Sequence, residues 1–154
     1  MAMKKVLTRL SSCGFTLMEV LLAAAILASA ISAILMTYYS CFVLISTSKN
    51  INITANAAMG LMEEIRSSAF PRIVDDYNGL NFIVNNIPQS RGVVYVDDTN
   101  PELLQVTISV CWRQGNRVIG EDTNLNGQLD AGEVDNGNNI IDSPVQLVTI
   151  IANR

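Results

Sequence analysis

The feature that most constrains this chain is a long uncharged segment near its N-terminus. No Asp, Glu, Lys or Arg occurs from Val20 to Ser48, a run of 29 residues, and most of these residues are apolar. A helix of that length extends for about 43 Å at roughly 1.5 Å per residue, and the hydrocarbon core of a bilayer is roughly 30 Å thick. The segment is therefore predicted to be a membrane-spanning helix.

Charged residues lie at the start of this segment. Three cations precede it, Lys4, Lys5 and Arg9, and one carboxylate, Glu19, lies at its N-terminal edge. Cationic flanks favour the cytoplasmic side of a membrane, so residues beyond about 48 are predicted to lie outside the cytoplasm. An acid at the edge of an apolar span is costly unless it finds a partner, which makes Glu19 a candidate functional residue.

A short motif joins the basic segment to the apolar one. It reads Gly14-Phe15-Thr16-Leu17-Met18-Glu19-Val20 and resembles the signature of type IV prepilins, the family of type IV pilins, type II secretion pseudopilins and competence pilins. The resemblance implies that residues 1–14 are a leader, which a prepilin peptidase removes after Gly14 before the new amine of Phe15 is methylated. It also implies that Glu19 neutralises the Phe15 amine of a neighbouring subunit during assembly. Opposite charges that meet in lipid remove much of each other's desolvation cost.

Three other kinds of N-terminal segment share some of these features. A plain signal anchor would give Glu19 no role. A secretory signal peptide would be cleaved after the small residues at 28–30, but the apolar run continues through Ile45. A lipoprotein signal would use Cys13, but here the apolar region follows the cysteine instead of preceding it. The prepilin interpretation is favoured.

Composition limits the chemistry of the rest of the chain. Histidine is absent from the 154 residues, and with it the usual general base and the commonest transition-metal ligand. Without the leader, 7 basic and 14 acidic residues leave a net charge near −7, which argues against nucleic-acid binding. Cys41 lies in the apolar helix and Cys111 in a predicted strand, so we expect neither a disulfide nor a cysteine metal site. The sequence has no Ser–His or Cys–His arrangement and no phosphate loop, so we do not expect an enzyme.

The second part of the predicted helix, from Ser46 to Phe70, is amphipathic. Its apolar residues recur at steps of three and four: Ile51, Ala55, Ala58, Met62, Ile65 and Ala69. Polar residues fall elsewhere around the helix: Asn52, Thr54, Asn56, Glu63, Glu64 and Ser67. Phe70-Pro71 is expected to end the helix, because the residue before a proline disfavours the α region. The apolar stripe is predicted to pack on a sheet.

Beyond Pro71 the pattern changes to the alternation of half-buried strands. The clearest strand is 103–112, where Leu104, Val106, Ile108, Val110 and Trp112 share one face and Gln105, Thr107, Ser109 and Cys111 share the other. Further strands are predicted at 81–84, 93–97 and 145–151. The predicted fold is α+β. A long N-terminal helix, whose membrane half is 15–48, packs on a small four-stranded antiparallel sheet within a globular domain at 49–154.

An acidic stretch lies between the last two predicted strands, at residues 121–142. It contains six acids and no basic residue. The segment from Asp122 to Glu133 fits the EF-hand loop pattern D-x-[DN]-x-[DN]-G-x5-E in full, with Gly127 at the sharp turn. The predicted ligand positions are Asp122, Asn124, Asn126, Gln128, Asp130 and Glu133. Hard oxygens without sulfur or imidazole suit Ca²⁺, so a calcium site is predicted.

A partial second copy of this loop follows at a spacing of 12 residues. Its candidate ligands are Asp135, Asn136, Asn138, Asn139 and Asp142, which form either a second, weaker site or part of the first. The copy has no glycine at its turn position and no closing glutamate. Residues 117–119 predict strand or loop instead of an entering helix, so the stretch resembles helix-poor calcium repeats more than calmodulin-type sensors. The alternative is a flexible polar loop that binds no cation.

These features together favour a structural protein: a minor pilin of a type IV pilus-like filament, stabilised by calcium. Its predicted partners are other pilin subunits, through the N-terminal helix, and the prepilin peptidase/N-methyltransferase. Its predicted location is a single pass through the cytoplasmic membrane with the C-terminal domain outside, followed by an extracellular or periplasmic filament. One alternative is a minor pseudopilin of a type II secretion system, which acts in protein secretion instead of cell adhesion. Another is a membrane-anchored, calcium-dependent binding module.

Overall fold

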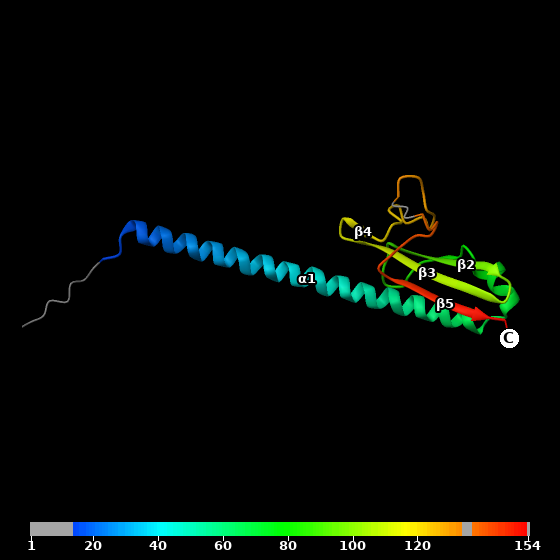
Figure 1. Ribbon diagram of the computed structural model, residues 1–154. Helices are drawn as coiled ribbons and strands as arrows, with labels where there is room; N and C mark the ends of the chain where they lie inside the picture. The colour runs from blue at the N-terminus through cyan, green and yellow to red at the C-terminus, as the bar shows by residue number, and fades with distance from the viewer. Residues whose placement is uncertain (1–13, 134–136, 154) are drawn as a thin grey trace, which may run out of the picture. The chain divides into compact units, whose positions relative to one another are not determined.

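The computed structural model describes residues 14–133 and 137–153 (Figure 1). The chain divides into two units, Met1–Val43 and Leu44–Arg154, and one helix of 51 residues, α1 (Leu17–Ser67), contributes to both. The second unit also contains a 3-10 turn, η1 (Phe70–Arg72), and a short helix, α2 (Ile73–Tyr77). Its five strands are β1 (Asn81–Phe82), β2 (Ser90–Asn100), β3 (Leu103–Gln114), β4 (Arg117–Ile119) and β5 (Gln146–Ala152).

The N-terminal half of α1 is apolar and exposed on every side within the single chain. No residue from Leu17 to Ile45 is buried. The hydroxyls in this half donate to carbonyl oxygens one turn earlier, as Ser32 does to Ala28 at 2.8 Å and Thr37 to Ala33 at 2.9 Å. Such internal bonds satisfy polar groups where water is absent. Among the described residues, α1 is the one helix long and apolar enough to cross a membrane, as predicted.

The C-terminal half of α1 supplies one side of the core. Ala58, Met62 and Ile65 are buried, and Ile51 and Ala55 pack against them in a half-buried state, which confirms most of the predicted stripe. Thr54 corrects it, because this residue was assigned to the polar side and is fully buried. Its hydroxyl donates to the carbonyls of Asn50 and Ile51 at 2.9 and 3.0 Å, so burial leaves no unsatisfied polar atom.

The end of α1 was predicted three residues too late. The helix ends at Ser67, and Ala69 is exposed outside it. The hydroxyls of Ser67 and Ser68 donate to the carbonyl of Glu64 at 2.7 and 3.1 Å, and they thereby compete for a carbonyl of the last turn. Pro71 lies in the following 3-10 turn, where its missing N–H costs nothing.

The sheet is antiparallel and has β3 at its centre. β3 pairs with β2 on one side (Val94 opposite Ile108) and with β5 on the other (Val106 opposite Thr149). β1 extends the sheet beyond β2, and β4 pairs with the last residues of β3. This arrangement confirms the α+β prediction of a long helix on a small antiparallel sheet. The strand predicted at 81–84 is only two residues long, residues 117–119, predicted as strand or loop, form the strand β4, and α2 was not predicted.

β3 is buried on both of its faces. Leu104, Val106, Ile108, Val110 and Trp112 pack against α1, as predicted. The other face was expected to be the polar one, yet Thr107, Ser109 and Cys111 are also buried. The cause is the acidic stretch, which folds over this face: Ile141 forms a second small core with Val93 and Cys111. The acidic stretch is therefore a packed part of the domain.

The core predicts how two similar substitutions differ in effect. Ile108→Ala removes a fully buried side chain, so it should lower the free energy of unfolding by about 2–5 kcal/mol. Ile150→Ala removes a side chain that is 66% exposed, and it should change the free energy by about 0.5 kcal/mol or less. Urea titration followed by the fluorescence of Trp112, the single tryptophan, measures both. Equal effects would contradict this assignment of the core.

Candidate functional site

The motif residues Gly14, Phe15 and Thr16 precede α1 in exposed, non-helical chain. Thr16 caps the helix: its Oγ1 accepts a hydrogen bond from the N–H of Glu19 at 3.2 Å, and its carbonyl accepts bonds from Glu19 and Val20. The spacing Thr-x-x-Glu is that of a capping box, a signal that the sequence analysis missed. The three cations that precede the apolar segment, Lys4, Lys5 and Arg9, lie outside the described residues, and so does Cys13.

Glu19 has two physical roles open to it. It lies in the first turn of α1 and is exposed, where a carboxylate interacts favourably with the helix dipole, typically by about 0.3–1 kcal/mol. It is also the only charged side chain from residue 14 to residue 48. The interaction with the helix dipole stabilises the single chain. The second role is to pair with a cation from another molecule, and Glu19 is the group in this half of α1 that can do so.

The acidic loop is organised around Asp122, which is fully buried. Its Oδ1 accepts a hydrogen bond from the N–H of Asn126 at 3.0 Å, and its Oδ2 accepts one from Gly127 at 2.8 Å. Gly127 has a φ of 81°, which favours glycine, and a Cβ at this position would collide with Asn81. The sharp turn predicted at Gly127 is present.

The two asparagines of the loop converge on a second carboxylate. The Oδ1 atoms of Asn124 and Asn126 accept hydrogen bonds from the N–H two residues later, at 2.9 and 2.7 Å, which is the geometry of Asx turns. Their Nδ2 atoms donate to the same oxygen, Asp130 Oδ2, at 2.8 and 2.6 Å. Three predicted ligand residues are thus brought together at Asp130.

Glu133 closes the loop back on its start. Its Oε1 accepts hydrogen bonds from the N–H and hydroxyl of Thr123 at 2.7 and 2.8 Å, and its Oε2 accepts one from the N–H of Asp130 at 3.0 Å. Burial by itself raises the pKa of the Glu133 carboxyl, but the hydrogen bonds from Asp130 and Thr123 outweigh it and lower the pKa below its usual value. Gln128 has an exposed side chain, and in an EF-hand loop this position contributes its backbone carbonyl.

The predicted ligands therefore gather in one loop, but their oxygens are occupied by N–H donors. Within the described ranges, no group of three or more Asp, Glu, His or Cys side chains is placed to hold a metal ion. At Asp130 the amide nitrogens of Asn124 and Asn126 face the carboxylate, where a cation would require oxygens. Each asparagine Oδ1 accepts one backbone N–H and has a second lone pair, so these oxygens and the carboxylates are the kind of ligand that a hard cation takes.

The candidate second site is only partly described, since Asp135 and Asn136 lie outside the described residues. Asn138 donates to Asp142 Oδ1 at 3.3 Å, and Asn139 adopts a left-handed turn with φ 58°. Asp142 also accepts a bond from Gln146, at 3.1 Å, and its backbone pairs with Glu121. These contacts close the base of the loop next to β5.

Two residues that the sequence analysis did not single out hold the loop on the sheet. Arg91 Nε donates to the carbonyl of Leu125 at 3.0 Å, and the hydroxyl of Tyr95 accepts a bond from the N–H of Ile141 at 3.1 Å. Burial raises the pKa of Tyr95, and it raises the pKa of the nearby Cys111 thiol to about 11, so this thiol is unreactive at neutral pH. Both anchors are long-range contacts that no local pattern indicates.

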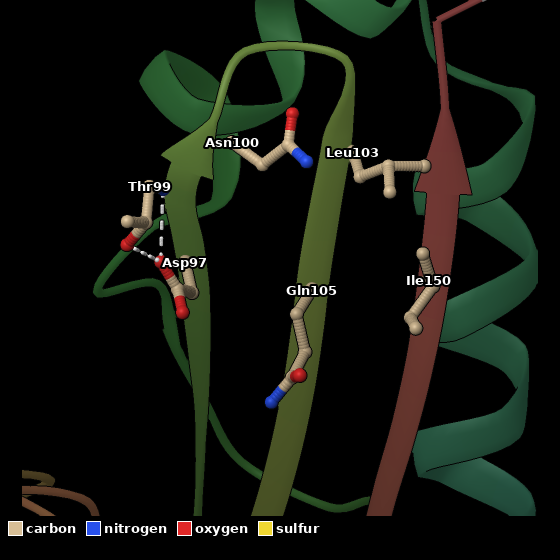
Figure 2. A pocket seen from close by; sticks show the side chains of 6 residues that line it. All are labelled: Asp97, Thr99, Asn100, Leu103, Gln105 and Ile150. Atoms are coloured by element: carbon tan, nitrogen blue, oxygen red, sulfur yellow. Dashed lines mark hydrogen bonds between the residues drawn. The ribbon is translucent and has the colours of Figure 1, made fainter.

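A shallow pocket of about 210 Å³ lies on the face of the sheet opposite α1 (Figure 2). Its lining residues are Asp97, Thr99, Asn100, Leu103, Gln105 and Ile150. Figure 2 shows the Asp97 carboxylate turned towards Thr99, whose hydroxyl and N–H both donate to it. The side-chain and backbone hydrogen bonds from Thr99 hold the pKa of Asp97 below its usual value. The carboxylate is engaged in a local turn.

Asp122 predicts a stability effect that does not depend on any cation. Asp122→Ala should lower the free energy of unfolding by about 1–3 kcal/mol in chelator, because it leaves the buried N–H of Gly127 without its acceptor and the N–H of Asn126 with Asn124 Oδ1 alone. Asp122→Asn keeps one side-chain oxygen and should cost less. Urea titration of Trp112 fluorescence measures both. An unchanged midpoint for Asp122→Ala would contradict the described loop.

Comparison of the chain with protein-family models, with curated proteins and with solved structures gives no match. A function for the chain is therefore inferred from its own residues and geometry.

Proposed function

We propose that this chain is a prepilin-type protein that, after processing, is a structural subunit, a minor pilin, of a type IV pilus-like filament. One observation carries the proposal: the motif from Gly14 to Val20 leads directly into a 51-residue helix whose apolar half is exposed on all sides. A helix that is apolar all round is stable only when lipid or other helices cover it. A subunit that is first held in the membrane and then packed through the same helix has both kinds of cover.

The local structure of the motif is compatible with processing. Gly14 and Phe15 lie in exposed, non-helical chain ahead of the cap at Thr16, and such chain is accessible to proteolysis. Cleavage after Gly14 would remove the basic leader and create a new amine at Phe15, so that Glu19 is the fifth residue of the mature chain. With the leader in the cytoplasm, the globular domain lies outside it.

Gly14 gives a prediction about cleavage. Gly14→Leu should abolish removal of the leader, whereas Gly14→Ala should reduce it only partly, because a peptidase pocket shaped for glycine excludes bulk. Among the residues that the structure describes, none lies within 4 Å of a Cβ at Gly14, so this part of the chain accommodates either side chain and the effect reports on the peptidase. The ratio of precursor to mature protein on a gel measures the outcome. Normal cleavage of Gly14→Leu would contradict the assigned bond.

The proposal includes calcium in the acidic loop. The residues that would hold it are Asp122, Asn124, Asn126, Asp130 and Glu133, together with the backbone carbonyl of Gln128. Support comes from the complete twelve-residue pattern, the turn at Gly127 and the convergence of the side chains on one loop. A bound cation would neutralise the carboxylates and crosslink a loop that connects β4 to β5 and covers β3.

A shearing experiment tests the structural role. Filaments sheared from cells that express a tagged chain should contain the mature protein, with the precursor left in the membrane fraction. Recovery of the mature chain only from membranes would contradict a filament subunit and favour the membrane-anchored module.

A further inference from the structure

The β3–β4 hairpin is attached to α1 at the point where the uncharged segment of the helix ends. Gln114 pairs with Arg117 across the hairpin, and the side-chain amide of Gln114 donates to the hydroxyl of Thr47 at 2.5 Å. The uncharged segment ends one residue later, at Ser48. All of these residues belong to the second unit, which begins at Leu44. Within this one unit, the hairpin therefore lies beside the turn of α1 at which the chain leaves the apolar segment.

The described cations of the second unit form two groups. Near the C-terminal end of α1, Arg66 pairs with Glu63 at 3.0 Å, and Arg72 pairs with Asp76 at 3.4 Å. The other group lies at the hairpin end of the unit and has no carboxylate within 4.0 Å in the described ranges: Lys49, Arg91, Arg113 and Arg117. In an acidic chain, cations that gather away from its carboxylates indicate an anionic partner from outside.

These four cations lie on different sides of the same end of the unit. Lys49 follows the uncharged segment directly on α1. Arg117 lies opposite Gln114, whose side chain reaches α1, whereas Arg113 points to the other face of the sheet because side chains alternate along a strand. Arg91 shares that face with Arg113, and the two line a pocket of about 300 Å³. A single small ligand in this pocket would not reach the cations on the other side, whereas a planar surface faces all of them.

An exposed apolar side chain accompanies the cations. Ile83 is 60% exposed and lines the same pocket as Arg91 and Arg113. The pocket also borders the acidic loop at Asn124 and Leu125, but its lining contains no Asp or Glu. Surfaces that combine cations with exposed apolar groups bind at the boundary between lipid headgroups and acyl chains, through charge attraction and apolar burial together. This composition favours a lipid surface as the partner.

We propose that the hairpin end of the globular domain docks on anionic phospholipid headgroups of the membrane that α1 crosses. Arginine and lysine donate to phosphate oxygens, and each cation near an anionic bilayer strengthens the attraction by roughly fivefold. The bilayer surface is the anionic plane that a domain meets at the end of a membrane span. The inference rests on the proposed function in one respect: α1 spans the membrane before the subunit enters a filament. Docking would hold the domain on the membrane until that step.

Energy transfer from Trp112 to labelled lipid headgroups tests the proposal. Trp112 is the single tryptophan and directly precedes Arg113. The full chain is placed in nanodiscs that contain a small fraction of dansyl-labelled headgroups, with chelator present. Transfer should be higher in phosphatidylglycerol than in phosphatidylcholine, and the difference should disappear in 1 M salt, where the Debye length is about 3 Å. Equal transfer in the two lipids at low salt would overturn the proposal.

Two double variants with the same change in charge provide a matched comparison. Arg113→Gln/Arg117→Gln should lower the ratio of docked to undocked chains by roughly 25-fold, so that transfer in phosphatidylglycerol falls to the level seen in phosphatidylcholine. Arg66→Gln/Arg72→Gln should retain the transfer of the unmutated chain. All four arginines are exposed, so the emission spectrum of Trp112 should report a folded domain in both variants. Equal transfer by the two double variants would overturn the assigned surface.

Alkaline extraction separates this outcome from that of the proposed function. Release of the chain from membranes at high pH would contradict both, because α1 would then not span the bilayer. If the chain resists extraction and its mature form begins at Phe15, equal transfer in the two lipids overturns the docking alone. If the leader is retained but transfer depends on lipid charge and on Arg113 and Arg117, the docking stands and the filament assignment fails.

Discussion

Glu19→Ala should leave a chain that is cleaved and inserted in the membrane but nearly absent from filaments. If Glu19 neutralises the Phe15 amine of a neighbour, its removal leaves an unpaired cation among packed helices. Breaking a buried ion pair costs about 3–5 kcal/mol, which lowers incorporation by about a hundredfold or more. Insertion itself should not suffer, because removal of a charge makes an apolar helix easier to insert. Quantitative blotting of the sheared and membrane fractions measures both.

The cap at Thr16 makes Glu19→Gln the informative control. Glutamine preserves the size of the side chain and serves as well as glutamate at the third position of a capping box. If Glu19 acted only on the helix start, Glu19→Gln would assemble like the unmutated chain. If Glu19 neutralises the amine of a neighbour, Glu19→Gln should be nearly absent from filaments, as Glu19→Ala is. If both variants entered filaments as well as the unmutated chain, Glu19 would have no role in assembly and would be only a part of the membrane anchor.

Calcium at a hundredfold excess over Kd should raise the melting temperature of the globular domain by about 10 °C or more. Binding to the folded state alone then adds about 2.7 kcal/mol, and about 1 kcal/mol shifts the melting temperature of a domain of roughly 100 residues by about 4 °C or more. Trp112 fluorescence follows the transition in the full chain in detergent, because the single tryptophan is buried in this domain. Magnesium should have much less effect, since it demands a tighter octahedral shell.

Variants of the loop separate cation binding from loop structure. Glu133→Ala should abolish the calcium shift, because the closing residue supplies two oxygens. Asp142→Asn should weaken the shift only if the second copy contributes. The lowered pKa of Glu133 means that its contribution is present above the usual carboxyl pKa and is lost as the pH falls through the lowered value, so melting at neutral pH tests the ionised loop. If calcium did not change the melting temperature, the loop would be a polar connection that binds no cation.

Much of the fold was predictable because its longest elements have strong local patterns. The uncharged run and the stripe at Ala58, Met62 and Ile65 predicted α1 to within three residues at its end. The alternation at 103–112 predicted β3. At β4 the sequence left strand and loop open, and α2 was missed, because three and five residues are too short to show a period. The burial of Thr107, Ser109 and Cys111 was missed because it depends on a loop that returns from far along the chain.

The candidate site was predictable in its residues but not in its hydrogen bonds. The spacing of Asp122, Asn124 and Asn126 predicted which side chains gather around Gly127. Clustered carboxylates repel one another without a cation, but Asp130 and Glu133 are surrounded by amide and hydroxyl donors. That network arises because asparagine offers a donor as well as an acceptor, and spacing alone does not show which of the two faces inward.

The mass of the mature N-terminus tests the central claim most directly. Top-down mass spectrometry of the protein from membranes and filaments should show a chain that begins at Phe15 and carries a methyl group on its amine. A chain that begins at Ile31, a lipid on Cys13 or a fully retained leader would contradict the prepilin assignment.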